Sequence, residues 1–364
     1  MWTKRLFILL VLVFLIVPAR AAKKKKKKTE EEQTQVLQLP KDPPNAVVAD
    51  TGRLSFEVSP LTTKGLLSQQ TREALKALLH QHHGAAIVKL RAFVAGTGDM
   101  RRVSMIVSET FTDKKLAIPA LSVVQVGALP MDGAQIVLES TAEEKKSVNP
   151  NGVAFFSGQA APTVDKSIEQ LTSALAAAGA EPPGVMRVTC FVSSLDESHA
   201  GMGKMQSAFP GAALDLVQMQ REPSVTGAEC EAVARLSAAP PVPLHFVNSD
   251  RLAKSANYSQ VAVVSAPKLV LTGTQLAFHD QESDIRLAFE RLGKALEPHG
   301  ASLGDVIMSH LYSLSRATAD KVRAVRFEFY DKSRPPASTM LLFEGLPSLD
   351  ASFAVEVIAV PSKP

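Results

Sequence analysis

The stretch Ala354-Val-Glu-Val-Ile-Ala359 places one carboxylate, Glu356, inside a run that otherwise has the composition of a buried strand. The same feature occurs twice earlier, at Glu139 and Glu231, and each copy closes a block of about one hundred residues. A carboxylate is costly to bury unless another group pairs with it. A chain that repeats this arrangement three times therefore indicates a tripled small domain in which the glutamates share a purpose.

The blocks repeat one order of elements. In the second block, a strand at 153–156 precedes a helix at 164–178 and a strand at 185–192, and the third block repeats this with a helix at 285–296 and a strand at 306–312. Strands with two helices per block predict an α+β sandwich whose helices cover one face of a sheet. The uncovered face needs a partner. We therefore expect three sheets to close around a pseudo-threefold axis, with clefts for small molecules between the blocks.

Composition shifts mark the expected boundaries. The first and most divergent block covers 46–145, the second 146–237 and the third 251–364, with a stiff, proline-rich linker at 238–250. Residues 23–45 begin with a run of lysines and glutamates, which is typical of a disordered linker.

The N-terminal segment 1–22 has the pattern of a secretory signal. Lys4 and Arg5 precede a twelve-residue apolar run, which is followed by small residues. The alternative is an uncleaved anchor held at the membrane surface by the lysines at 23–28. We expect an exported protein, periplasmic or secreted, with membrane anchoring as the alternative.

Charge argues against nucleic acid as a partner. The formal net charge is +4, but residues 1–32 carry +6, so the remainder of the chain carries −2. A mildly acidic body with few aromatic residues lacks the basic footprint and stacking platforms of a nucleic-acid binder. Cys190 and Cys230 leave two alternatives open: a disulfide, if the protein is exported, or two small apolar side chains in core strands.

Several stretches resemble the RidA/YjgF (L-PSP endoribonuclease-like) family, whose members are usually homotrimers of one such unit. They are 257–260 and 269–275 in the third block, 153–159 in the second and 121–130 in the first. The resemblance implies three tandem chorismate-mutase-like sandwich units that form an intramolecular pseudo-trimer. It also implies a monomer with a small-molecule ligand, no cofactor and no metal.

Family members that hydrolyse imines and enamines clamp the substrate carboxylate with an arginine, which suits the bidentate geometry of a guanidinium. The positions matched to that arginine are Leu121, Leu214 and Ala337, so we expect carboxylate substrates to bind poorly. The resemblance implies that Glu356 and Tyr258 are catalytic, with Glu231 and Glu139 as weaker candidates. The implied ligand-binding residues are Ser157, Gln159, Thr272, Gln275 and Thr339.

Other interpretations stay open. A non-catalytic binding or scaffold protein would use the glutamates for ion pairs across block interfaces, for instance with Lys89 or Arg187. A ribonuclease fits the charge poorly, and a cyclic-amide hydrolase needs a repeated serine–lysine pair that the sequence does not show. His80, His82 and His83 end a predicted helix, but no Cys, Asp or Glu nearby completes a metal-ligand set.

Overall fold

The computed structural model describes residues 40–224 and 226–362, and these residues form one compact unit. The predicted signal segment, the lysine run and most of the predicted disordered linker lie outside the described residues. In the part of the chain that is described, no helix is both long and apolar enough to cross a membrane.

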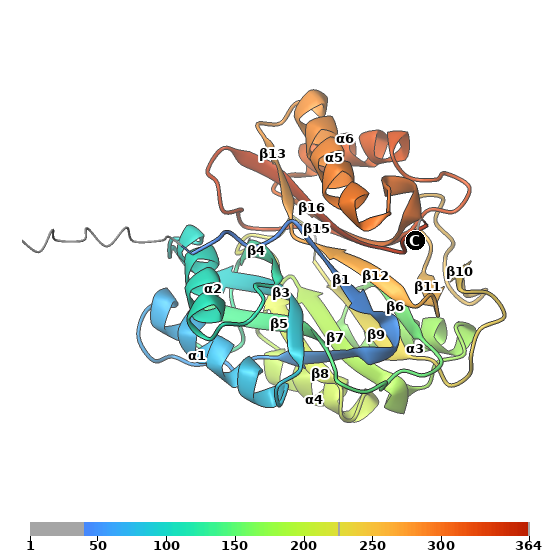
Figure 1. Cartoon of the computed structure of the whole chain (residues 1–364), viewed down its shortest axis with the longest axis horizontal. Helices are drawn as coiled ribbons and strands as arrows, with labels where there is room; N and C mark the ends of the chain where they lie inside the picture. Colours follow the sequence, from blue (N-terminus) through green and yellow to red (C-terminus); the bar gives the residue numbers. More distant parts are fainter. Residues whose placement is uncertain (1–39, 225, 363–364) are drawn as a thin grey trace, which may run out of the picture. The chain divides into compact units, whose positions relative to one another are not determined.

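Three mixed sheets, each covered by two α-helices, make up the described residues, which confirms the predicted α+β class (Figure 1). The first sheet has the order β2 (Leu54–Val58), β5 (Ile136–Glu143), β3 (Ala86–Ala95) and β4 (Ala120–Val126), with helices α1 (Leu67–Gln81) and α2 (Arg101–Asp113). The second sheet has the order β10 (Leu244–Val247), β11 (Val261–Val264), β6 (Val153–Ala161), β9 (Ala228–Arg235), β7 (Val185–Val192) and β8 (Ala213–Gln218), with α3 (Val164–Ala177) and α4 (Ser198–Ala208). The third sheet has the order β1 (Ala46–Asp50), β12 (Lys268–Thr272), β16 (Ala351–Ala359), β14 (Val306–Ser313) and β15 (Ala337–Leu342). A sixth strand, β13 (Gln275–Phe278), also pairs with β16. The helices of this sheet are α5 (Glu282–Leu296) and α6 (Arg316–Val325).

Local sequence explains why the helices begin and end where they do. At the start of α3, the Thr163 side chain accepts a hydrogen bond of 3.3 Å from the Lys166 backbone N–H, as expected of an N-cap. Leu171 and Leu175 lie on one face of α3 and are buried against the second sheet. Gly179 follows the helix with a positive φ, which a residue with a side chain rarely adopts. The predicted helix at 164–178 therefore matches α3 closely.

The sheets exchange strands across the predicted block boundaries. β1, at the start of the first block, pairs with β12 of the third sheet. β11, in the third block, pairs with β6 of the second sheet, and β10 lies within the predicted proline-rich linker. Hydrophobic patterns indicate where strands are but not which strands pair, so the sequence could not show this exchange. A cut near residue 145 or 251 would separate strands from their sheets.

The faces that the helices leave uncovered pack against one another. Phe93 of β3, Phe191 of β7 and Phe343, after β15, form an aromatic cluster in which the Phe93–Phe191 and Phe191–Phe343 ring centroids are each 5.7 Å apart. Fully burying a phenylalanine side chain stabilises a fold by about 1.5–3 kcal/mol. The partner that the sequence analysis required for each bare sheet face is therefore another sheet of the same chain.

Strand register places the three recurring glutamates at equivalent positions. Antiparallel pairing sets Glu139 opposite Arg91, Glu231 opposite Thr189, and Glu356 opposite His310. All three glutamates lie on central strand pairs, and their side chains face the region where the sheets meet.

Candidate functional site

The three recurring glutamates are buried in a cluster of charged side chains rather than in open clefts. Their exposed fractions are 1%, 2% and 3% for Glu139, Glu231 and Glu356. We call this group the central ion cluster; it comprises Lys89, Arg91, Glu139, Arg187, Glu231, His310 and Glu356.

Arg91 joins the first sheet to the second. Its Nε donates a hydrogen bond of 2.6 Å to Glu139 of its own sheet, and its Nη2 donates one of 2.6 Å to Glu231. Arg187 Nη1 lies 3.6 Å from Glu139. Buried carboxylates need such partners because isolated buried charge is very unfavourable.

His310 lies between two carboxylates. Its Nε2 is 3.1 Å from Glu231 Oε1, and its Nδ1 is 3.3 Å from Glu356 Oε1. A neutral imidazole has one donor and one acceptor nitrogen, so two carboxylate partners require the doubly protonated ring. Burial opposes this charge, but Glu231 and Glu356 raise the pKa of His310 above its usual value.

Glu356 is already fully engaged. It forms an ion pair with Lys89, accepts a hydrogen bond from Ser122 Oγ, and accepts a further one of 2.7 Å from Tyr312. Burial raises the pKa of Glu356, but Lys89 and His310 outweigh it and hold that pKa well below its usual value. The ion pairs of Glu356 with Lys89 and of Glu139 with Arg187 confirm that these glutamates pair with basic side chains of a neighbouring sheet. This geometry leaves Glu356 poorly placed to activate a water.

The space beside the central ion cluster is too small for a metabolite. A cavity of about 30 Å³ is bordered by Arg91, Glu139, Arg187, His310 and Glu356. Such a volume has room for about one water molecule. A ligand site must therefore be sought elsewhere.

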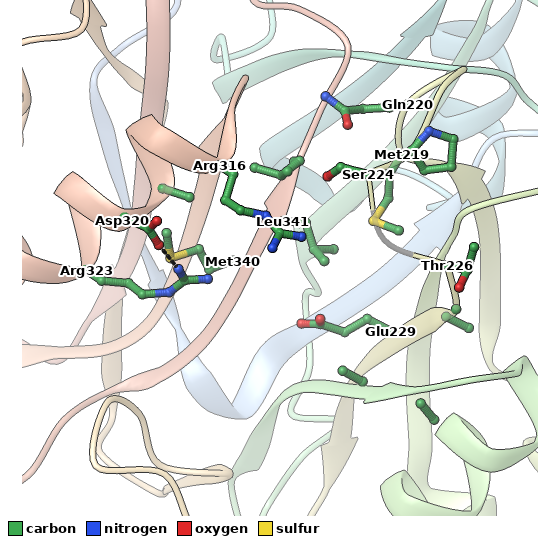
Figure 2. Close-up of a pocket in the computed structure, with 17 residues that line it drawn as sticks. Met219, Gln220, Ser224, Thr226, Glu229, Arg316, Asp320, Arg323, Met340 and Leu341 are labelled. Carbon is green, nitrogen blue, oxygen red and sulfur yellow. Dashed lines mark hydrogen bonds and ion pairs between the residues drawn. The ribbon is translucent and has the colours of Figure 1, made fainter.

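A larger cleft, of about 450 Å³, lies between the second and third sheets, and we call it the Glu229 cleft. Figure 2 shows Glu229 of β9 on one wall, with Arg316 and Arg323 of α6 on the other, and their charged groups directed into the space between. The other lining residues are Ala160, Ala161, Met219, Gln220, Pro223, Ser224, Thr226, Gly227, Ala228, Ala319, Asp320, Met340, Leu341 and Leu342.

Glu229 occupies a register position that carries a carboxylate in one sheet of the three. In the second sheet Glu229 pairs with Phe191. The equivalent pairs are Val137 with Phe93 in the first sheet and Ala354 with Tyr312 in the third. Of these three equivalent strand positions, the one in the second sheet therefore differs by its carboxyl group, and this group borders the Glu229 cleft.

The surroundings of Glu229 favour its neutral form. Burial and the negative charge of Glu231, two residues along the strand, raise the pKa of Glu229 to about 8. Its carboxyl group packs against Gly158, where a Cβ would lie 1.9 Å from Glu229 Oε1. At neutral pH this carboxyl group holds a proton that it can donate to a ligand.

Tyr258 lies in a different place from Glu356. It lines a cavity of about 540 Å³ together with Lys332 and Arg334, and burial and the charge of Glu229 raise its pKa. Glu356 borders the small central cavity instead. The structure thus brings Tyr258 into the electrostatic range of Glu229 and does not bring it together with Glu356.

The predicted ligand-binding residues make hydrogen bonds within or between the sheets. Ser157 Oγ donates to Ser259 O at 2.6 Å and accepts from Ser338 N at 2.8 Å, which links the second and third sheets. Thr339 Oγ1 links the same two sheets, because it accepts from Gly158 N. The other three make contacts within one sheet or at its edge: Gln159 donates to Ser157 O, Thr272 Oγ1 exchanges hydrogen bonds with the Val357 backbone, and Gln275 donates to Asn45.

Register corrects one position that the sequence analysis assigned to the missing arginine. Leu121 pairs with Leu90, and Leu214 pairs with Val188; the equivalent pair in the third sheet is Ser338 with Ser309. Ala337 is one residue too early, because a pattern match does not detect a slip of one residue.

The sequence analysis missed Glu229, Arg316 and Arg323. Glu229 was visible, because the stretch Glu229-Cys-Glu231 contains two glutamates of which we counted only the second. The arginines lie on a helix nearly one hundred residues further along, so local patterns do not connect them with Glu229.

Cysteine and histidine residues have structural surroundings. Cys190 of β7 and Cys230 of β9 lie opposite each other and form a disulfide. His82 Nε2 is 2.8 Å from Ser140 Oγ, and burial lowers the pKa of His82 to about 4. Among the described residues, no three His, Cys, Asp or Glu side chains gather in a way that could hold a metal ion.

The family model for Endoribonuclease L-PSP matches residues 31–144 and 248–361, which together make up more than half of the chain. The chain belongs to this family. The L-PSP family is the one that the sequence resembled, and its model also matches the first block, where the resemblance was loosest.

Solved structures of Rid proteins are similar to parts of the chain. YyfB from Yersinia pestis, a conserved Rid protein of unknown function, has 16% identity and a TM-score of 0.30, and the match covers 33% of this chain and 99% of that one. Rv2704 from Mycobacterium tuberculosis, of the YjgF/YER057c/UK114 family, has 25% identity and a TM-score of 0.24, with 25% and 78% covered. A chorismatase matches 86% of this chain and 98% of its own, with 12% identity and a TM-score of 0.25. No curated protein matches the chain.

Proposed function

We propose that the protein binds a small, negatively charged metabolite in the Glu229 cleft and hydrolyses an imine within it. The observation that carries this proposal is the placement of Glu229 opposite Arg316 and Arg323 across a cleft of about 450 Å³. This volume lies in the range that suits a small molecule. Family membership supports a small-molecule ligand and chemistry of the deaminase kind.

The arginines of α6 supply the anion recognition that the strands lack. Leu121, Leu214 and Ser338 cannot bind a carboxylate through a guanidinium. Arg316 and Arg323 are exposed to the cleft, and Arg323 also pairs with Asp320. A ligand carboxylate that binds to these guanidinium groups would place its other end near Glu229. We therefore propose imines of carboxylic acids as substrates, against the expectation that carboxylates bind poorly.

Glu229 would act first as a general acid. Its carboxyl group, protonated below a pKa of about 8, donates its proton to the imine nitrogen. The resulting carboxylate then takes a proton from a water as the water oxygen bonds to the imine carbon. The carbinolamine expels ammonia after proton transfer to its nitrogen, leaving a ketone. One imine and one water thus give one ketone and one ammonia, with Glu229 restored.

The assembly that we propose is a fused trimer in one chain. The support is the equivalent register of Glu139, Glu231 and Glu356 on three sheets that pack together. Such a chain would act as a monomer. The disulfide between Cys190 and Cys230 supports export to an oxidising compartment. Contact of the N-terminal segment with a membrane surface remains the alternative for localisation.

The test is hydrolysis of imino acids generated in situ by an amino-acid oxidase. We expect the 2-oxo acid to be released faster when the protein is added than with the oxidase alone. Glu229→Gln should reduce kcat about a hundredfold or more. Replacing both Arg316 and Arg323 with glutamine should mainly raise KM. Arg286→Gln, which removes an exposed ion pair with Glu328 on the helix layer, is the matched control and should leave both constants unchanged. No acceleration, or full activity in Glu229→Gln, would rule out this function.

A binding protein without catalysis is the second candidate, because none of the strand positions assigned to the clamping arginine holds one. In that case, small carboxylates would raise the melting temperature of the wild type and of Glu229→Gln, without any hydrolysis. The double arginine variant would lose this stabilisation.

A further inference from the structure

A second cleft, of about 390 Å³, lies between the first and second sheets, where β2 approaches β8. We call it the Asp215 cleft. It corresponds by register to the Glu229 cleft: Val137 takes the place of Glu229, and β8 takes the place of β15. The two clefts differ in their charged side chains, because the described lining of the Asp215 cleft has no counterpart of Arg316 and Arg323.

Asp215 is the unusual group of this cleft. Its exposed fraction is 4%, and its Oδ2 has no hydrogen-bond partner among the described residues. Buried carboxyl oxygens in folded proteins nearly always have a partner, because an unpaired one costs free energy. A donor supplied by a ligand would remove this cost.

Apart from Ser59 and Gln81, the remaining lining of the Asp215 cleft is apolar or acidic. Val58, Leu61, Met202 and Leu214 supply apolar surface, and Glu57 supplies a second carboxyl group. In this described part of the chain, the lining includes no lysine, arginine or histidine, in contrast to the Glu229 cleft. The cleft therefore selects against anions and in favour of a cation with a hydrocarbon body.

We propose that the Asp215 cleft is a second binding site, for a small apolar amine. The ammonium group would donate a hydrogen bond to Asp215, and the hydrocarbon part would lie against Val58, Met202 and Leu214. A charge-assisted hydrogen bond of this kind is among the stronger polar interactions in a protein.

Charges around Asp215 make the binding depend on pH. Burial and the charge of Glu139 raise the pKa of Asp215 well above its usual value, against the lowering effect of Arg91 and Arg187. Burial and the charge of Glu144 also raise the pKa of Glu57, which lines the same cleft. Because an ammonium ligand requires the ionised carboxylate, a raised pKa means that binding competes with protonation of Asp215. The affinity should therefore increase as the pH rises toward the pKa of the amine.

The experiment is calorimetric titration of the full chain with n-hexylamine hydrochloride at neutral pH, in two buffers of different ionisation enthalpy. We expect saturable binding with release of protons. Asp215→Asn, which keeps the shape of the side chain, should weaken binding about tenfold or more and abolish the proton release. Glu229→Gln should bind as the wild type does, because it alters the other cleft. Hexanoate and hexanol should bind at least about tenfold more weakly than the amine.

Met202→Trp provides an independent variant if Asp215→Asn does not fold. The indole would fill the cleft from α4 while Asp215 stays in place, so amine binding should be lost. Three outcomes overturn the proposal: no saturable amine binding, equal binding by Asp215→Asn or Met202→Trp, or equal binding of hexanol. The proposal does not depend on imine hydrolysis, so its failure would leave the function of the Glu229 cleft intact.

Discussion

Glu229 and Glu231 lie two residues apart on β9 and face the same side of the strand, yet their carboxyl groups differ in charge at neutral pH. Glu231 accepts hydrogen bonds from Arg91 and His310, and although burial raises its pKa, the charge of Arg91 outweighs this and lowers it. Glu229 borders a cleft, and burial and the charge of Glu231 raise its pKa to about 8. The ion pairs with Arg91 and His310 keep Glu231 negatively charged, and this charge helps to hold the proton on Glu229.

Glu229→Gln should stabilise the fold at alkaline pH. The pKa of Glu229 rises from 4.5 to about 8 on folding, so its stability contribution is complete below pH 4.5 and is lost as the pH rises through 8. The variant lacks this loss. We expect equal free energies of unfolding near pH 4.5 and a gain of about 1–3 kcal/mol for the variant near pH 8.5. Urea denaturation at both pH values measures the difference.

Stabilisation together with loss of activity would mark Glu229 as a functional residue, because sites of function often cost stability. Glu169→Gln, on the exposed face of α3, is a control whose stability should hardly depend on the substitution. If Glu229→Gln destabilised the protein at both pH values, Glu229 would have a structural partner and our account of its proton would be wrong.

Arg91→Met should be strongly destabilising. The methionine would leave Glu139 and Glu231 without the guanidinium that binds both of them. Removing one partner of a buried ion pair costs about 3–5 kcal/mol. Arg72→Met removes the exposed ion pair with Glu109 and should cost less than about 1 kcal/mol. Urea midpoints for the two variants make the comparison, and similar small losses would contradict the importance of the central ion cluster.

The central ion cluster was predictable only in part. Regular placement of Glu139, Glu231 and Glu356 in apolar strands indicated that each glutamate has a partner. The identity of the partners depends on contacts over long sequence distances: Arg91 and Glu231 are 140 residues apart. Local periodicity carries no information about such pairs, nor about the pairing of β1 with a strand more than two hundred residues later.

Alternation along β9 could have indicated the site more directly. Glu229 and Glu231 must face the same side of a strand, so a buried Glu231 implies that Glu229 lies near the same interface. What alternation does not provide is the opposite wall. Arg316 and Arg323 line the cleft because α6 belongs to a neighbouring sheet, which only the packing of the sheets determines.

His310 should make stability depend on pH above about 6.5. Two carboxylates raise its pKa above 6.5 in the fold, so its contribution is complete below pH 6.5 and is lost as the pH rises through the folded pKa. The stability difference between wild type and His310→Gln should therefore decrease from pH 6 upward. Chemical denaturation at several pH values tests this, and NMR titration of the imidazole protons identifies the group. A difference that stays constant with pH would mean that His310 is neutral in the fold.

Gly158→Ala should separate catalysis from stability. A Cβ at this position would lie 1.9 Å from Glu229 Oε1 and 2.6 Å from both its Cδ and its Cγ, so the glutamate side chain must move. The backbone of Gly158 has no positive φ, and alanine adds no strain there. Because the displaced atoms belong to one flexible side chain and not to the backbone, we expect a stability change of about 1 kcal/mol. A displacement of about 1 Å of a catalytic group reduces kcat by up to about a hundredfold.

Gly203→Ala, on the exposed face of α4 with no atom within 4 Å of the new Cβ, is the matched control and should leave kcat unchanged. Full activity in Gly158→Ala would show that the position of Glu229 does not limit the reaction.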